Sequence, residues 1–148
     1  MKARVSLIDG VSFEGTADSG HRVIMDGPPE LGGQNRGTRP MEMLLIGLGG
    51  CSAFDVVRML RKGRVEMTDC EVEIEAERAA QDPKVFTRIH LHFVVSGKNV
   101  PESKVRRAVQ LSAEKYCSAS IMFSQVARVT HDFEIVESGG AGQSGPIA

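Results

Sequence analysis

The chain has 148 residues, of which 18 are basic and 19 acidic, for a formal net charge of −1. This length predicts one domain with a core of its own, and the balanced charge without a basic run argues against nucleic-acid and anionic-membrane partners. We find no uninterrupted apolar run of about 18 residues and no signal-peptide pattern at the start. The sequence therefore predicts a cytoplasmic protein that spans no membrane.

The first 25 residues predict a meander of three short antiparallel strands, separated by turns rich in Asp and Gly. The strands are expected over 2–8, 11–17 and 21–25. Residues 26–39 then read as a Gly/Pro-rich loop that carries Arg36 and Arg39. Loops of this length often carry function, and this one leads directly into the central segment of the chain.

The central segment, residues 39–62, predicts one long buried helix. Pro40 stands in its first turn, where the missing N–H of a proline costs no hydrogen bond, and Gly63 follows its end. One face of this helix carries four residues at spacings of four, three and four. They are Leu44, Leu48, Cys51 and Asp55.

Three glycines beside Cys51 leave a second interpretation open. Gly47, Gly49 and Gly50 each cost a helix about 0.5–1 kcal/mol relative to alanine, and close approach of another backbone is one reason for them. The alternative is a strand over 43–48, a Gly-Gly turn and a helix that begins near Cys51, where the helix dipole favours a thiolate. We favour the continuous helix, because its apolar face runs through the glycines.

The rest of the chain predicts a β-hairpin, a second helix and a last strand. Alternation places the hairpin strands over 70–78 and 87–96 and the last strand over 127–136. Pro101 opens the second helix, and Cys117 comes at or just past its end. The order is βββα–ββα–β, which predicts a single α+β domain with mostly antiparallel sheets. We expect this domain over residues 1–137 and a flexible tail over 138–148.

The three cysteines are the main candidates for chemistry. Cys70 points inward on a strand and is expected to pack, and the three positions form no C-x-x-C pair and no zinc-like cluster. In a reducing compartment, any disulfide is expected to be transient and chemical. If Cys51 and Cys117 meet, a thiolate can attack a peroxide oxygen and become a sulfenic acid, which the second thiol converts to a disulfide.

Such a site needs a cation beside the thiolate and an acid that holds the cation. Arg36, Arg39 and Glu42 are the nearest candidates in sequence, although simple solvation also explains a loop arginine. His90 and His92 form an H-x-H on the outer side of a strand, for which a solvated sheet face is a simpler explanation than a metal site. No P-loop or Ser-His-Asp pattern occurs, and no cofactor or metal is expected.

Four segments of the chain resemble the OsmC/Ohr family, most closely its YhfA-like branch: PMEMLLIGLGGCSAFDVV, CEVEIEAER, FTRIHLHFVVSG and LSAEKYCSASIM. The resemblance covers residues 1–137. It implies an OsmC-like fold with two central helices in an intertwined homodimer. The glycines of the first central helix would then let backbones approach each other in the shared core.

The resemblance also implies a thiol peroxidase that acts on organic hydroperoxides. Cys51 would be the peroxidatic cysteine and Cys117 the resolving one, an Arg and a Glu would assist, and an external dithiol would be the reductant. The family's peroxidases usually carry Glu directly after the helix proline. Here Met41 follows Pro40, and Glu42 is shifted by one residue, or about 100° around the helix.

Two other functions stay open from the sequence. The cleft between the helices is expected to be lined by methionines, which suit a permissive apolar pocket. They are Met41, Met43, Met59 and Met122. The protein would then be a ligand-binding or redox-sensing dimer without peroxidase turnover. In the third reading, the cysteines only pack within an obligate dimer.

Overall fold

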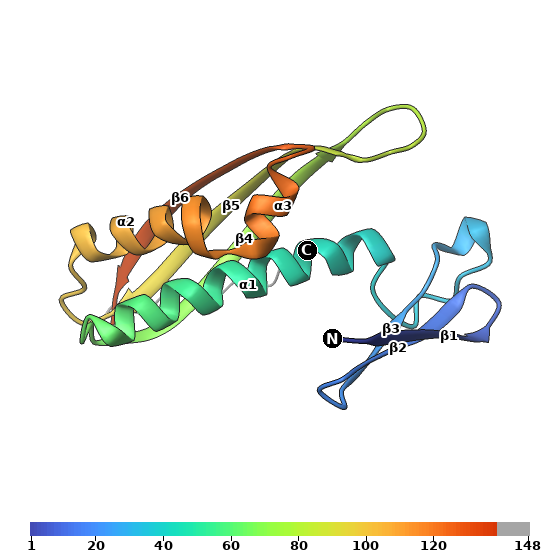
Figure 1. The fold of residues 1–148 in the computed structure, drawn as a ribbon, viewed down its shortest axis with the longest axis horizontal. Helices are drawn as coiled ribbons and strands as arrows, with labels where there is room; N and C mark the ends of the chain where they lie inside the picture. Colours follow the sequence, from blue (N-terminus) through green and yellow to red (C-terminus); the bar gives the residue numbers. More distant parts are fainter. Residues whose placement is uncertain (139–148) are drawn as a thin grey trace. The chain divides into compact units, whose positions relative to one another are not determined.

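A computed structural model of the chain describes residues 1–138, so the tail expected over 138–148 lies outside the described residues except for Ser138. In chain order the elements are β1 (Ala3–Asp9), β2 (Ser12–Ala17), β3 (Arg22–Met25), the 3-10 turn η1 (Pro29–Leu31), α1 (Pro40–Lys62), β4 (Met67–Arg78), β5 (Phe86–Gly97), α2 (Glu102–Leu111), the π-helical turn η2 (Ser112–Tyr116), α3 (Ser118–Phe123) and β6 (Arg128–Glu137) (Figure 1). The predicted α+β class and the order βββα–ββα–β are confirmed.

The chain divides into two compact units, Met1–Gly47 and a second unit that begins at Leu48. The boundary falls inside α1. A single domain over residues 1–137 stays a prediction.

In the first unit, β1, β2 and β3 form the expected antiparallel meander. Asp26 organises the loop that follows. Its buried carboxylate accepts hydrogen bonds from the backbone N–H groups of Gly27, Gln34 and Arg36 at 2.8–3.0 Å. These bonds, that from Arg36 above all, lower the pKa of Asp26 to about 2 despite the opposing effect of burial. The Gly/Pro-rich loop therefore closes around an ionised carboxylate.

The central helix α1 is continuous through its three glycines, so the alternative of a strand, a turn and a shorter helix is wrong. Pro40 is its first residue, as predicted. The Glu42 carboxylate accepts a hydrogen bond from the Arg39 backbone N–H at 2.8 Å, which is one half of a capping box. At the other end, the Val65 N–H bonds to the Leu60 carbonyl around Arg64, whose φ is +54°.

In the second unit, β4, β5 and β6 form one sheet in that order. The β4–β5 pair is antiparallel and the β5–β6 pair is parallel, so the sheets are mostly antiparallel, as predicted. The core of the unit lies between the inner face of this sheet and the helices. Its largest buried side chains are Leu48, Val56 and Leu60 of α1, Ile89, Leu91 and Val95 of β5, and Val105 and Val109 of α2. The helices α1 and α2 therefore pack against the inner face of this sheet.

Gly49 shows why α1 has a glycine at one of these positions. It is buried, and a Cβ built on it would lie 2.7 Å from Cδ1 of Ile74 on β4. At Gly47 and Gly50, a Cβ would meet nothing within 4 Å. Close approach to the sheet within the second unit therefore explains Gly49, and it does not explain the other two.

We expect Gly49→Val to lower the free energy of unfolding by about 1–3 kcal/mol, because the branched side chain overpacks the helix against β4. Gly49→Ala should stay within about 1 kcal/mol of the wild type, since the end of the Ile74 side chain can turn away and alanine favours the helix. Urea unfolding of the two variants measures the difference. Equal midpoints for Gly49→Val and the wild type would contradict the close approach.

By length and composition alone, α1 is a helix able to cross a membrane, with a mean hydropathy of 1.6. This differs from the expectation that no such segment exists, because a mean over 18 residues tolerates the charged residues that interrupt an apolar run. The core helix of a globular protein passes the same test. Within the second unit, α1 buries Leu48, Val56 and Leu60, and 28% of the 18-residue window is buried.

Candidate active site

The second central helix changes geometry just before Cys117. The α-helix α2 ends at Leu111, and the next five residues form the π-helical turn η2. Cys117 follows in extended conformation, with φ −73° and ψ 102°, and its side chain caps α3. The prediction that Cys117 stands at or just past the end of the second helix is confirmed. The widened turn is a feature that frequently occurs at functional sites.

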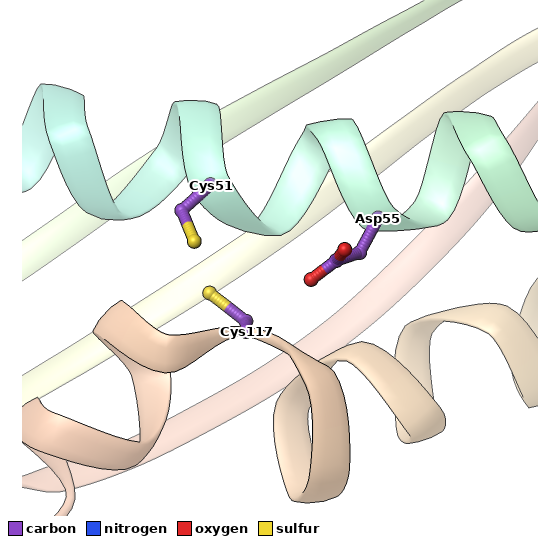
Figure 2. A group of neighbouring side chains, drawn as sticks. All are labelled: Cys51, Asp55 and Cys117. Atoms are coloured by element: carbon purple, nitrogen blue, oxygen red, sulfur yellow. The ribbon is translucent and has the colours of Figure 1, made fainter.

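The structure brings Cys51 and Cys117 together. The two Sγ atoms and a carboxylate oxygen of Asp55 all lie within 4.8 Å of one another. Figure 2 shows Cys51 and Asp55 on successive turns of α1, with Cys117 pointing toward them from the segment between η2 and α3. The two helices are joined nearby by a hydrogen bond of 3.3 Å from the Ser112 hydroxyl to the Ser52 carbonyl.

Cys117 is a fully buried thiol with two polar contacts. Its Sγ lies 3.2 Å from the Ser52 hydroxyl and accepts a hydrogen bond from the Ser120 N–H at 3.4 Å. Burial raises the pKa of Cys117, the contacts with Ser52 and Ser120 lower it, and Cys51 raises it further, with a net upward shift. Cys117 is therefore held mainly as a neutral thiol.

The other two cysteines differ from Cys117 in exposure and position. All three are free thiols, and Cys51 is partly exposed. Cys70 lies on β4, opposite Val95 of β5, and burial together with the neighbouring charge of Asp69 raises its pKa to about 11. Cys51 is thus the member of the close pair that a small molecule reaches first.

The two loop arginines have partners inside the first unit. The Arg36 guanidinium forms an ion pair of 3.2 Å with Asp9. The Arg39 guanidinium donates to the Asn35 side chain at 3.1 Å and to the Gly37 carbonyl at 3.2 Å. Arg36 and Arg39 are therefore placed by contacts within their own unit, as is Glu42 through its helix-capping bond. Their part in the chemistry of the cysteines stays a prediction.

An open groove of about 880 Å³ lies beside the cysteine pair in the second unit. Asp55 and Tyr116 line it, together with Met59, Leu60 and Leu111. Its remaining wall is strongly basic and contains Arg58, Arg61, Lys62, Lys104 and Arg107. Of the four methionines expected in a cleft, Met59 lines this groove, whereas Met122 is 71% exposed.

The H-x-H histidines lie on the outer face of the sheet, as the alternation predicts. His90 Nδ1 lies 2.8 Å from the Thr130 hydroxyl, and His92 Nδ1 lies 2.5 Å from the Asp132 carboxylate. The hydrogen bond to Asp132 raises the pKa of His92, and the same bond lowers the pKa of Asp132. The pair thus has a structural explanation in strand pairing between β5 and β6.

We expect His92→Gln to destabilise the protein more at pH 5.5 than at pH 9, by less than about 1 kcal/mol because the pair is partly exposed. With the pKa of His92 raised, its contribution is fully present below about pH 6.5 and is lost as pH rises through the folded-state value. The contribution of Asp132 is lost only in acid. Urea unfolding at both pH values measures the effect. An equal loss at both values would contradict the ion pair.

Four polar residues around the pair were not assigned to the site from the sequence. The helical spacing predicts that Asp55 shares a helix face with Cys51, which is a signal in the sequence, but the spacing alone gives Asp55 no role. The Cys117 sulfur contacts the Ser52 hydroxyl and the Ser120 N–H, and the Ser112 hydroxyl donates to the Ser52 carbonyl. Small hydroxyl residues inside otherwise apolar helical segments were the available signal for them.

The family model described as "OsmC-like protein" matches residues 33–132, which is more than half of the chain. The chain belongs to the OsmC-like family. Protein YhfA of Escherichia coli strain K12 is 46% identical to it over 136 residues, which are 92% of this chain and 98% of that protein. The resemblance to the OsmC/Ohr family and its YhfA-like branch is confirmed.

Solved structures share the fold of this OsmC-family chain. A hypothetical protein from Aquifex aeolicus VF5 has a TM-score of 0.81 at 28% identity, over 93% of this chain and 96% of that one. The organic hydroperoxide resistance protein OhrB of Bacillus subtilis has a TM-score of 0.61 at 20% identity, over 90% of this chain and 98% of that one. The second likeness shows the fold alone.

Proposed function

We propose that this protein reduces organic hydroperoxides, or hydrogen peroxide, through a sulfenic acid and disulfide cycle of Cys51 and Cys117. The observation that carries the proposal is the approach of the two Sγ atoms to within 4.8 Å, from positions 66 residues apart in the chain. The two sulfur atoms of a disulfide lie about 2.05 Å apart, so the two Sγ atoms would have to approach by less than about 3 Å to form the bond. The protein also shares its fold with a protein named as an organic hydroperoxide resistance protein, which adds to the case.

The two cysteines take different roles because their surroundings differ. Cys51 is partly exposed, whereas Cys117 is buried and has a raised pKa. A peroxide therefore meets Cys51 first, and the thiolate form of a cysteine is the nucleophile that attacks it. Cys117 acts second, when a sulfenic acid has formed within its reach.

The cycle has three balanced steps. The Cys51 thiolate attacks one oxygen of ROOH, the O–O bond breaks, and with one proton the products are Cys51 sulfenic acid and ROH. The Cys117 thiol then displaces the hydroxyl group from the Cys51 sulfur, which gives the disulfide and water. An external dithiol reduces the disulfide by two thiol–disulfide exchanges and leaves as its own cyclic disulfide.

Arg36, Arg39 and Glu42 belong to the proposal as assisting residues. A guanidinium next to a reacting thiolate stabilises its negative charge. The Arg36 guanidinium forms an ion pair with Asp9, whereas the Arg39 guanidinium donates hydrogen bonds to neutral oxygens. Of these two arginines, Arg39 therefore has no ion pair among residues 1–138. This difference favours Arg39 over Arg36, with Glu42 one turn away on α1.

We also propose that the protein is a homodimer in the cytoplasm. Large apolar side chains are exposed on both units, which is unusual for a monomer. They include Val5, Leu7 and Ile8 on β1, Leu44, Ile46 and Phe54 on α1, and Met122 and Val126 near α3. Burial of these side chains against a second copy would remove them from water. Light scattering should then give twice the mass of one chain.

The test of the peroxidase is steady-state consumption of cumene hydroperoxide and of hydrogen peroxide by the purified protein with a small dithiol. We expect catalytic turnover, with the organic substrate the faster because the neighbouring groove carries apolar side chains. Consumption no faster than the dithiol alone would reject the proposal.

A second candidate is binding of a small apolar ligand without turnover. The 880 Å³ groove beside Asp55 and Tyr116 favours it, because its size lies within the range of small-molecule pockets. A ligand retained in native mass spectra, together with absent peroxide turnover, would support this candidate over the peroxidase.

A further inference from the structure

We propose that Cys51, Asp55 and Cys117 bind a divalent transition-metal ion of the zinc type when the two cysteines are reduced. This site differs from the sequence expectation of no metal, which rested on spacing alone. It does not depend on peroxidase activity. Metal binding and the disulfide exclude each other, because both use the same two sulfur atoms.

The geometry of the three donors is close to that of a metal site. Two thiolates at about 2.3 Å and a carboxylate oxygen at about 2.1 Å from a tetrahedral zinc ion lie roughly 3.5–3.8 Å from one another. Here the three donor atoms lie within 4.8 Å of one another, so no pair has to close by more than about 1.3 Å. Cys51 and Asp55 are four residues apart on α1, so their side chains project from one face toward Cys117 (Figure 2).

The charge of the cluster also favours a cation. Asp55 forms no ion pair among residues 1–138, although basic side chains line the same groove. A bound dication would pair with this carboxylate and with the two sulfur ligands at once.

Contacts around Cys117 match those that support a metal thiolate. The Ser52 hydroxyl lies 3.2 Å from its Sγ, and the Ser120 N–H donates to it at 3.4 Å. Ser112 in turn bonds to the Ser52 carbonyl and fixes the helix at this point. Such outer contacts orient a ligand and adjust its basicity.

The donor set and its access select the metal. Two sulfurs and one carboxylate oxygen suit Zn²⁺ or Co²⁺, whereas Mg²⁺ and Ca²⁺ prefer oxygen ligands only. Asp55 lines the open groove, so solvent reaches this side of the cluster, although the basic side chains of the same groove oppose the approach of a cation. Cu⁺ would use the two thiolates and gain little from Asp55.

The test is titration of the reduced, metal-free protein with Co²⁺, followed by competition with Zn²⁺. We expect one equivalent to bind, with a sulfur-to-cobalt charge-transfer band that Zn²⁺ abolishes. Asp55→Asn should weaken binding about ten-fold or more while the band persists, and Cys51→Ser should reduce the band. Cys70→Ser and His92→Gln are the matched controls, and both should bind as the wild type does.

Three results would overturn the metal site. They are the absence of saturable binding, binding unchanged by both Asp55→Asn and Cys51→Ser, and loss of binding in His92→Gln. Circular dichroism confirms that each variant is folded. Because no peroxide is present, a missing peroxidase activity leaves these outcomes unaffected, and a missing metal site leaves the peroxidase assay unaffected.

Discussion

Cys51→Ser is expected to reduce hydroperoxide turnover by about 10³-fold or more, since a serine hydroxyl is a far weaker nucleophile than a thiolate. The substitution changes one atom at a partly exposed position, so the fold should be retained. The measurement is the initial rate of cumene hydroperoxide consumption with saturating dithiol. The intact mass of the variant after treatment should show no added oxygen at position 51.

Cys70→Ser is the matched control for this result. Cys70 lies on β4, and its pKa of about 11 leaves almost no thiolate at neutral pH. We expect its turnover to equal that of the wild type. The result that would contradict this has two parts: Cys51→Ser keeps more than about one tenth of the wild-type rate, and Cys70→Ser is slower than Cys51→Ser. The nucleophile would then be Cys70.

Cys117→Ser is expected to perform one reduction and then lose activity. The first step needs only Cys51, but the sulfenic acid that forms has no thiol within reach and is oxidised further to a sulfinic acid. With excess hydroperoxide, the variant should gain the mass of two oxygen atoms, while the wild type should lose two hydrogen atoms. Turnover should fall within the first few cycles, even in the presence of dithiol.

Folding of this variant needs its own check, because position 117 is fully buried. A serine there keeps the contacts to Ser52 and to the Ser120 N–H, so only a modest change in the unfolding midpoint is expected. If the folded variant turned over at the wild-type rate without over-oxidation, Cys117 would not be the resolving cysteine. An external thiol would then take that role directly.

Much of this fold was readable from the sequence, because periodicity and turn chemistry acted locally. The alternation of Val72, Ile74 and Ala76 with glutamates fixed the face of β4 that packs inward. Pro40 and the helical face with Cys51 fixed α1. These patterns depend on neighbours a few residues apart, so a single sequence carries them.

Other features depended on contacts that periodicity does not encode. The parallel β5–β6 pairing follows from the crossover through α2 and α3, and nothing in the β6 residues specifies its direction. In the sequence, the apolar spacing of α2 continues through residues 112–116 without a break. The spacing therefore predicts one uninterrupted α-helix where the structure has a π-helical turn. Both are decided by tertiary packing.

The candidate site is predicted only in part, because it too depends on tertiary packing. Cys51 and Cys117 were named from their contexts, yet their approach depends on how α1 packs against the end of α2. Asp55 acquires meaning only when Cys117 lies opposite it. The sequence suggests Glu42 as an acid for the chemistry, and in the structure its carboxylate accepts a helix-capping hydrogen bond from the Arg39 backbone N–H.

The most direct measurement is peptide mapping, under non-reducing conditions, of the reduced protein treated with one equivalent of organic hydroperoxide. We expect a disulfide to join the peptides that contain Cys51 and Cys117, while Cys70 remains a free thiol. A digest in which Cys51 and Cys117 both remain free, or in which Cys51 is joined to Cys70, would contradict it.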